Sequence, residues 1–482
     1  MQKNVAFHRI FDLNLPQHWV LVACAATGLG AYAGLVMLHL EQGTLRGQHT
    51  PNTLAWYTIA FVSYLVALIW IETRRSASMV LILSTGLAFR LLLLVTVPTL
   101  SDDVYRYIWD GHLVNHGRSP YALPIDSPEL DYLEIPQRAQ ANNRWMASPY
   151  LPTAQFLFAG LTYLFPLQPL YVQLTMVLFD LLAALFLTKL LIIAGQLPYR
   201  VVIYFWNPLV IIEVAHGAHV DVLMVFLTLL SLWLTFSPRR SKVNGWLAPI
   251  LLGLATVTKI LPMLLLPVLF WRWNWRQLVL YGLVVLAMIA PFGLSAGWGL
   301  IGPLDGTGLF GAIRIYADQW NFNSGLFHWL EVDWLPRLGL VETTTWAKRI
   351  TGLTMLLVLA GTWLVARQRA GILPTLRLMA VPSMAYLLLT TTVHPWYLLM
   401  LLAFLPFLPP CPTESPWRWL ILAPWLYLSG TVALSYLTYV NPLDFREFEW
   451  IRNTEWVPTL ILVLTWLVVS RLTRLVGLIR KS

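Results

Sequence analysis

The sequence predicts an all-α, polytopic membrane protein with about 14 helical spans, because three observations agree. Hydrophobic residues make up 58% of the 482 residues and charged residues only 11%, whereas soluble domains usually carry about 25% charged residues. Apolar runs long enough to cross a bilayer recur from Trp19 almost to the end of the chain. Many of the 24 Trp residues stand at the ends of these runs, as an interfacial belt requires. We therefore expect residues 1–482 to form a single integral-membrane unit without a soluble domain.

The basic residues set the expected topology. The net charge of +9 could indicate nucleic-acid binding, but the Lys and Arg residues lie mostly in short loops, where an excess marks the cytoplasmic side. Lys3 and Arg9 precede the first span, so we expect the N-terminus, and with it the C-terminus, in the cytoplasm. The first apolar run is too long for a signal peptide and is interpreted as a membrane anchor. Cys24 and Cys411 are the two cysteines, and their positions predict no disulfide framework.

The expected spans follow from the length of each apolar run. Before residue 240 they cover roughly residues 18–40, 54–72, 78–99, 169–194, 200–215 and 219–236. The run at 152–166 is too short to span the bilayer comfortably, so an interfacial or partly inserted helix is expected there.

The run at 246–271 contains Lys259 and Pro262 near its centre. It predicts either one long span or two short arms that meet at an outer vertex, and two arms keep the basic residues that follow it inside. The remaining spans are expected at roughly 277–293, up to about residue 365, in a hairpin with His394 at its outer turn, and on both sides of a loop at 441–455.

Two long outer loops are expected, at about residues 100–151 and 294–346, and their length and Pro-bounded pieces predict short helices on the membrane surface. The first loop begins with the sequence SDDVYRYIWDGHLVNHGRSPY. Asp103 and Asp110 are seven residues apart in it, so a helix would carry both near one face, with Arg106 beside them. Acidic and basic groups gathered at the mouth of a membrane span are typical of a membrane-surface enzyme.

Three segments resemble motifs of the GT-C class of polyprenyl-phosphate-sugar-dependent glycosyltransferases, which includes bacterial mannosyltransferases. The first is DVYRY, followed by a Gly-x-x-Pro-Tyr turn at residues 117–121. The second is Trp-Asn-Pro at 206–208 with AHGAHVD at 215–221, which resembles N-P…G-H-N-D except that Val220 replaces Asn. The third is TKILP at 258–262, which resembles T-K-x-x-P.

The resemblance, together with the residue types, implies a set of site residues. Asp103 is the expected catalytic base, with Asp102 as the second candidate. The expected contacts of the donor phosphate are Lys259, Arg106 and Arg90. The expected substrate-binding residues are Asp110, Tyr105, His219, Asp221, Tyr316, Asn321 and His394.

Each assignment has a structural alternative. The Asp pair could cap a helix, and Lys259 could extend along the apolar surface to the interface. For Arg90 we favour an ion pair with Asp180 inside the membrane over a contact with phosphate. Glu213 could join either network.

Two further segments have competing interpretations. His216, His219 and Asp221 have a spacing that could gather a metal ion, but a hydrogen-bonded turn that positions substrate is favoured. The residues from Tyr316 to Asn323 combine aromatic rings with amides and a carboxylate, as carbohydrate sites do, or form a surface helix on the bilayer.

The expected function is inverting transfer of a hexose, with mannose favoured, from a polyprenyl-phosphate donor to a lipid-linked glycan, glycolipid or protein acceptor. No cofactor is required, although a divalent metal stays an alternative. We expect a multi-pass protein of the bacterial inner (plasma) membrane with its site on the periplasmic face. The alternatives are a lipid-linked oligosaccharide flippase or another transporter, and a glycan polymerase or ligase that uses a diphosphate-linked donor. A transporter would place its ionisable groups near the midplane, whereas most candidates here stand at outer ends.

Overall fold

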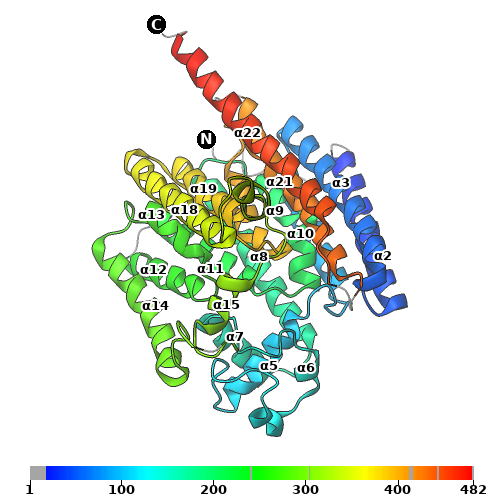
Figure 1. The fold of residues 1–482 in the computed structure, drawn as a ribbon. Coiled ribbons are helices and arrows are strands. Elements are labelled where there is room, and N and C mark those ends of the chain that lie inside the picture. Colours follow the sequence, from blue (N-terminus) through cyan, green and yellow to red (C-terminus); the bar gives the residue numbers. More distant parts are fainter. Residues whose placement is uncertain (1–17, 239–241, 303, 412–415, 442–444, 480–482) are drawn as a thin grey trace.

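The computed structural model describes residues 18–238, 242–302, 304–411, 416–441 and 445–479. Helices form its regular structure (Figure 1), and the one pairing of extended backbone in these ranges is a bridge between Phe322 and Thr392. The predicted all-α fold is therefore confirmed. Lys3 and Arg9, on which the expected orientation of the N-terminus rests, lie outside the described residues.

In the described residues the helices follow one another along the chain, joined by turns and loops. The first are α2 (Trp19–Gln42), α3 (Thr50–Arg74), α4 (Met79–Leu93), α5 (Asp103–Asn115), α6 (Pro136–Gln140), α7 (Pro152–Leu164), α8 (Pro169–Ile193), α9 (Val202–Phe205) and α10 (Pro208–Ile211). The next are η5 (Ile212–His216), α11 (Asp221–Phe236), α12 (Lys242–Thr256), η6 (Leu261–Leu265), α13 (Leu266–Leu269), α14 (Trp275–Ala296), α15 (Gly311–Gln319), α16 (Leu326–His328), η7 (Trp329–Trp334) and α17 (Leu335–Arg337). The last are α18 (Thr343–Gln368), α19 (Ile372–Leu389), η8 (Pro395–Leu398), α20 (Leu399–Phe404), α21 (Ala423–Thr431), η11 (Val432–Tyr439) and α22 (Glu449–Ile479). Short 3₁₀ turns are η2 (Gly47–His49), η3 (Pro128–Leu133), η4 (Pro198–Val201), η9 (Leu405–Phe407) and η10 (Pro416–Ile421).

The described residues contain eight helices that are long and apolar enough to cross a membrane. They are Trp19–Gln42, Gly47–Arg74, Pro169–Ile193, Trp275–Ala296, Thr343–Gln368, Ile372–Leu389, Arg418–Tyr439 and Glu449–Leu472. The segments Pro208–His216 and Asp221–Phe236, expected as two spans, form one bent pair with an angle of 116° between them. Shorter apolar helices occur at Met79–Leu93, Val243–Thr256 and Pro395–Phe407. The protein is thus a polytopic membrane protein, while the expected number of about 14 spans stays a prediction.

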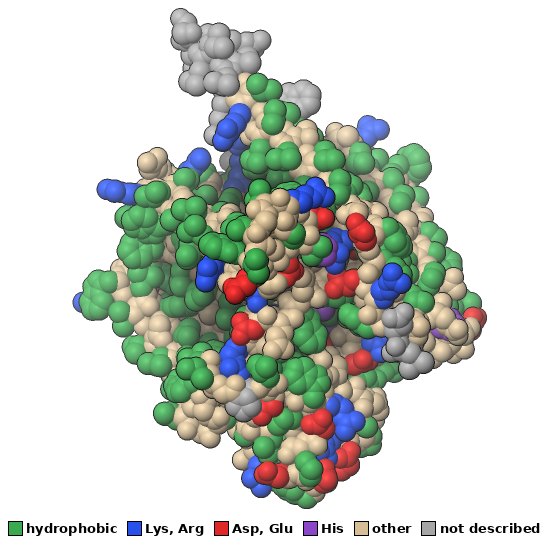
Figure 2. Space-filling model, in the orientation of Figure 1, with side chains coloured by type: hydrophobic (Ala, Val, Ile, Leu, Met, Phe, Trp, Pro, Cys, Tyr) green, Lys and Arg blue, Asp and Glu red, His purple; other side chains and the backbone are tan. Residues whose placement is uncertain are grey.

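Residues 100–151, the first of the two predicted outer loops, fold into a small lobe made by α5, η3 and α6, with α7 packed against α5. Figure 1 shows this lobe at one end of the molecule, opposite the end where the C-terminal part of α22 extends outward. The lobe has its own apolar cluster around Trp109, Leu113 and Leu130. Charged side chains gather on the lobe and near the centre of the face in Figure 2, whereas hydrophobic side chains cover much of its flanks. The short helices expected in this loop, and the short helix expected at 152–166, are therefore present.

The run at 246–271 forms two short arms and not one span. Helix α12 ends at Thr256, and a 3₁₀ turn begins at Leu261 after a break that contains Lys259. This break is the vertex that the sequence offered as one of two interpretations. It leaves Lys259 at the end of a helix beside the lobe rather than in the middle of a span.

Candidate active site

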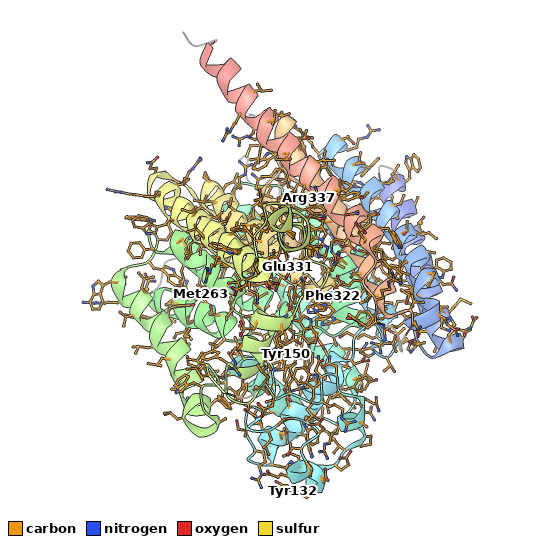
Figure 3. The ribbon with its side chains drawn as sticks, in the orientation of Figure 1. Tyr132, Tyr150, Met263, Phe322, Glu331 and Arg337 are labelled. Carbon is orange, nitrogen blue, oxygen red and sulfur yellow. The ribbon has the colours of Figure 1, made fainter. Side chains whose placement is uncertain are left out.

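A cavity of about 640 Å³ lies where the lobe meets the helical bundle. Its walls come from the start of α5, the vertex after α12, α15, the turn before η8 and the end of η11. Tyr150 and Phe322, which both line it, lie near the centre of the molecule in Figure 3, whereas Tyr132 lies at the far tip of the lobe. Segments that are distant in the sequence thus meet around one space large enough for a sugar and part of its carrier.

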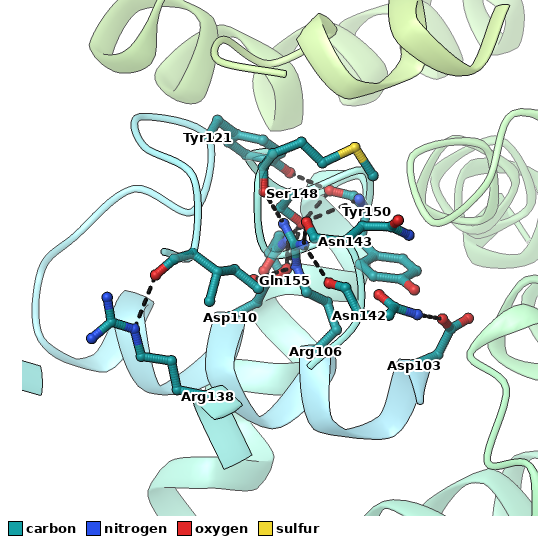
Figure 4. A network of polar contacts seen from close by, with 12 residues as sticks. Asp103, Arg106, Asp110, Tyr121, Arg138, Asn142, Asn143, Ser148, Tyr150 and Gln155 are labelled. Atoms are coloured by element: carbon teal, nitrogen blue, oxygen red, sulfur yellow. Dashed lines mark hydrogen bonds and ion pairs between the residues drawn. The ribbon is translucent and has the colours of Figure 1, made fainter. Parts of the chain in front are cut away.

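Asp103 lines this cavity at the first position of α5. Its Oδ1 accepts a hydrogen bond from the Asn142 amide (Figure 4), and its side chain is 13% exposed. A carboxylate in the first turn of a helix is stabilised by the amino-terminal end of the helix dipole. Asp103 is therefore held in one orientation and still faces the cavity, as a catalytic base must.

Asp102 also lines the cavity but is occupied by a cation. Its Oδ2 lies 3.0 Å from Nη1 of Arg46, which lines the cavity too. Burial raises the pKa of Asp102, and the Arg46 guanidinium opposes that shift. Asp102 is therefore the weaker of the two candidates for the base, because an ion pair with Arg46 competes for its lone pairs.

Arg106 and Asp110 lie behind the wall of the cavity and not in it. Both are 1% exposed, and Arg106 Nε lies 3.3 Å from Asp110 Oδ1. Arg106 donates to the carbonyl groups of Asn142, Asn143 and Met146, and Figure 4 shows this network closed by Ser148 and Gln155 on Asp110. The expected contacts of Arg106 with phosphate and of Asp110 with substrate have no support in this geometry, because buried charges that are paired hold backbone in place. Tyr105 is half-buried against the apolar core and does not line the cavity.

Lys259 lines the cavity at the vertex after α12. Its Nζ lies 2.6 Å from Oδ1 of Asp221, the first residue of α11, and 4.6 Å from the centre of the Tyr397 ring. The Lys259 side chain is 23% exposed. The Lys259 ammonium group therefore has a fixed position in the cavity wall. Asp221 pairs with this group and does not itself line the cavity.

The turn between the two arms of the bent pair brings His219 behind Asp103. His219 Nδ1 lies 3.7 Å from Asp103 Oδ2, and its Nε2 lies 3.1 Å from Glu213 Oε2. His216 instead contacts Thr96 Oγ1 at 2.7 Å. His216, His219 and Asp221 therefore have three separate sets of partners, and no group of three or more His, Cys, Asp and Glu in the described ranges is arranged to hold a metal ion.

Arg90 is fully buried and forms an ion pair with Asp180. Arg90 also donates to the carbonyl groups of Gly86 and Phe205, and Asp180 accepts a hydrogen bond of 2.6 Å from Tyr204. The structural pairing favoured from the sequence is confirmed. Arg90 does not line the cavity, so the alternative contact with the donor phosphate is not supported.

The second outer loop contributes part of the expected set. Tyr316 on α15 lines the cavity. His394 lines it as well, stacked between Phe322 and Trp396 with ring centres 4.6 and 4.5 Å away. Burial lowers the pKa of His394 to about 3, so its ring is neutral at pH 7. Asn321 is exposed, donates to Glu331 Oε2 at 2.8 Å and lies outside the cavity lining.

Sequence reasoning missed Arg46, Asn142 and several of the rings that line the cavity. Arg46 had a signal, because it is a basic residue in a loop assigned to the outer side, where basic residues are sparse. Tyr150, Tyr439 and Phe445 are aromatic residues near the ends of predicted spans, where a membrane-interface belt explains aromatic residues equally well. Asn142 had no signal, since its role depends only on where the loop returns to α5.

One comparison with known proteins gives a match. A family model described as alpha-(1->6)-mannopyranosyltransferase, N-terminal domain, matches residues 18–275, which is more than half of the chain. No curated protein and no solved structure gives a significant match. The matched range covers the lobe, the His219 turn and the Lys259 vertex, so the chain belongs to the alpha-(1->6)-mannopyranosyltransferase family and is a membrane mannosyltransferase.

Proposed function

We propose that this protein is an inverting GT-C glycosyltransferase that moves a mannosyl residue from a polyprenyl monophosphate to a glycan, glycolipid or protein acceptor. The observation that carries the proposal is that Asp103 and Lys259 line the same cavity. One supplies an acceptor for a proton and the other a cation for a departing phosphate. These are the two charges that transfer from a phosphate-linked sugar requires.

The reaction follows from this arrangement in one displacement. The acceptor hydroxyl attacks the anomeric carbon while its proton passes to the Asp103 carboxylate. The bond between the anomeric carbon and the phosphate oxygen breaks, and the phosphate keeps the electron pair. Lys259 neutralises the developing charge, and a cation in a cavity partly screened from water does so more strongly than in bulk solvent.

The remaining polar and aromatic residues orient the sugar. His394 is neutral at pH 7, so it contributes hydrogen bonds and a stacking surface and not a charge for the phosphate. Tyr316 and the neighbouring rings offer flat apolar faces that a hexose can pack against. Holding the acceptor hydroxyl and the anomeric carbon in line supplies part of the rate enhancement, because the two reactants no longer have to find each other.

The family description supports a finer proposal, in which the product linkage is α-(1→6). The acceptor group is then the primary hydroxyl on C6 of a sugar. A single displacement inverts the anomeric carbon, so an α product requires a β-linked donor phosphate.

We also propose that the site faces the outer side of the membrane. The lobe lies opposite the C-terminal part of α22, which carries Arg471 and continues into a basic C-terminus (Figure 1). An excess of basic residues marks the cytoplasmic side. The lobe and cavity are then on the side where a lipid-linked donor presents its sugar outside the cell.

Incubation of the purified protein with a panel of polyprenyl-phosphate sugars tests the proposal. Mannosyl, glucosyl and galactosyl monophosphates and one diphosphate-linked sugar are offered with a C6-accessible mannoside, and products are analysed by mass spectrometry and by NMR of the anomeric proton. We expect an α-(1→6)-linked mannoside from the polyprenyl-monophosphate mannose donor and no transfer from the diphosphate-linked sugar. Transfer only from the diphosphate donor would identify a polymerase or ligase, and movement of lipid-linked sugar across vesicles without any transfer would identify a flippase.

A further inference from the structure

His219 is a buried histidine whose ring has charged neighbours on both sides. It is 0% exposed and lies 3.7 Å from Asp103 Oδ2 and 3.1 Å from Glu213 Oε2. The first contact is too long for a hydrogen bond and the second is not aligned as one. Both ring nitrogens and Glu213 Oε2 are therefore buried without hydrogen-bond partners in the part of the chain that the structure describes. Buried polar groups without partners are rare and call for an explanation.

The turn that carries His219 has an unusual backbone. Residues Ile212–His216 form a π-helix, a form that appears mostly as single turns at functional sites. Ala218 follows with a φ of +56°, a left-handed conformation that costs energy for a residue with a Cβ atom. A Cβ atom on Gly217 would lie 2.8 Å from the His219 ring, so this position has room only for glycine. The backbone is therefore shaped to put this ring between the two carboxylates.

The two sides of the ring are not equivalent. Glu213 has its other oxygen, Oε1, occupied by the Tyr436 hydroxyl at 2.8 Å, so Oε2 is fixed in its direction toward His219 Nε2. Trp396 stacks on the ring at 3.9 Å and restrains its tilt. A nearby carboxylate favours the tautomer with the proton on the ring nitrogen that it faces, and the Glu213 oxygen at 3.1 Å is nearer to Nε2 than the Asp103 oxygen at 3.7 Å is to Nδ1. Nε2 then carries the proton and Nδ1 presents its lone pair to Asp103.

We propose that His219 is a positioning residue that acts through Asp103, by accepting a hydrogen bond from Asp103 only after Asp103 has taken the proton of the acceptor hydroxyl. This inference rests on the proposed function of Asp103 as the base. Before transfer, a lone pair on Nδ1 faces an ionised carboxylate, and the distance of 3.7 Å fits the absence of a bond. As the proton arrives, the Asp103 carboxylate loses its charge and no longer repels the Nδ1 lone pair, and once the acceptor oxygen has released the proton the new O–H donates to Nδ1. The contact is then stronger in the transition state than in the ground state, which is the condition for it to speed the reaction.

Several elements bring other charged or titratable side chains near His219, but each of these side chains has a partner elsewhere. Lys259 and Asp221 pair with each other at 2.6 Å. His216 binds Thr96, and His394 stacks beside Trp396. Asp103 and Glu213 are thus the carboxylates whose oxygens lie within 4 Å of its ring nitrogens in the described residues.

The central test is His219→Gln, measured as kcat and KM with a polyprenyl-phosphate mannose donor. Gln places its amide near the former Nε2, so the Glu213 side is preserved while the acceptor at Nδ1 is lost. We expect kcat to fall by roughly 10- to 100-fold, below the full contribution of about 10²–10⁴ from a general base. The donor KM should change by less than about threefold, because the contact is made only in the transition state.

A double-mutant cycle separates action through Asp103 from a general loss of structure. In an Asp103→Asn background, His219→Gln should reduce kcat by less than about threefold further, because no protonated carboxyl is left to donate. An equal loss in both backgrounds would overturn the proposal, as would a normal kcat in the single variant. A raised donor KM with a normal kcat would instead make His219 a substrate-binding residue.

Glu213→Gln gives an independent test of the ring orientation. The Tyr436 hydroxyl keeps the amide oxygen at Oε1, so the amide nitrogen faces His219 Nε2 and donates to it. This variant should therefore impose the opposite tautomer and lower kcat by a similar factor, although the shape of the side chain is unchanged. Unaltered kcat in Glu213→Gln would contradict the assignment of the tautomer.

His216→Gln is the matched control, since His216 is a buried histidine in the same turn with no carboxylate contact. His216→Gln should lower the melting temperature without the selective fall in kcat at nearly unchanged donor KM that we expect for His219→Gln. Thermal unfolding without substrate tests the Glu213–His219 contact apart from catalysis: the melting-temperature shifts of Glu213→Gln and His219→Gln should be less than additive, because both substitutions alter this one contact. Wild-type protein that transfers no sugar would refute the proposed function, and additive shifts would refute the Glu213–His219 contact.

Discussion

At the scale of single residues, the cavity depends on side chains that have a fixed partner on one side and open space on the other. Asp103 is held by Asn142 and faces the cavity, and Lys259 is held by Asp221 and does the same. In the proposed reaction such side chains need little reorganisation when substrate arrives, so their charges stabilise the transition state at low cost.

The residue-scale prediction with the largest effect concerns Asp103. Asp103→Asn keeps the shape and the contact with Asn142 but cannot accept a proton, so kcat should fall by roughly a hundredfold or more. Asp102→Asn should lower kcat by a smaller factor, because Asp102 is already paired with Arg46. Turnover of both variants with the mannosyl donor, beside donor binding and melting temperature, checks this. Normal turnover of Asp103→Asn with an inactive Asp102→Asn enzyme would move the base one residue back.

Lys259 carries the second residue-scale prediction. Lys259→Ala removes the cation from the phosphate, and a hydrogen bond to a charged group is worth about 1.5–3 kcal/mol, so kcat/KM for the donor should fall about 10- to 100-fold. Lys259→Arg keeps the charge and should lose less. Because Ala also leaves Asp221 without its cation, the melting temperature is measured in parallel. Equal kcat/KM in Ala and wild-type enzymes would leave Lys259 with no part in donor use.

At the scale of secondary-structure elements, the lobe is held together by a close approach of α5 and α7. Gly111 permits it, because a Cβ atom there would lie 2.3 Å from the Phe158 carbonyl oxygen. Arg106 and Asp110 form an ion pair within α5, and they tie the returning loop to this helix through the carbonyl groups of residues 142, 143 and 146 and the Ser148 hydroxyl. The position of Asp103 at the start of α5 therefore depends on contacts along the whole helix.

Gly111→Ala should destabilise the lobe by about 1–3 kcal/mol or more, since the clash involves backbone and cannot be relieved by a rotamer change. Gly160→Ala on α7 is the matched control, because nothing lies within 4 Å of the added atom. That substitution should be neutral or should stabilise the helix by about 0.5–1 kcal/mol. The melting temperatures of the two variants test this packing. A larger decrease for Gly160→Ala than for Gly111→Ala would contradict it.

At the scale of the whole molecule, the lobe and the C-terminal part of α22 lie at opposite ends (Figure 1). The lobe forms one wall of the cavity, so the proposed transfer takes place on the side of the membrane that the lobe faces. The side it faces decides whether the donor is used outside or inside the cell.

Cysteine labelling tests this topology. In a background with Cys24 and Cys411 replaced, Glu129→Cys on the lobe should react with an impermeant maleimide in intact cells. Gln368→Cys at the end of α18 should react only after the membrane is opened. Both wild-type side chains are exposed in the structure, so access to the label depends on the side of the membrane. The opposite pattern would place the lobe in the cytoplasm and exclude an outer donor.

Much of the fold and part of the site could be predicted from local sequence. A run of apolar residues must become a helix in a bilayer whatever surrounds it, because its backbone has no other partners. Asp103 and His394 stand at the ends of such runs, Lys259 interrupts one, and Tyr316 lies in a predicted loop between two. All four line the cavity. The pairing of Arg90 with Asp180 followed from the same cost of an unpaired charge.

The sequence by itself therefore determined that the chain is an all-α membrane protein and supplied four of the polar residues that line the cavity. Only the tertiary structure decided their partners. It sent Arg106 and Asp110 into the lobe and Asn321 to the surface, brought Arg46 and Asn142 to the two Asp residues, and joined His219 to Glu213. The physical reason is distance along the chain: burial of a residue is set by its local run, whereas a contact across many residues depends on how the helices pack and on where each loop returns.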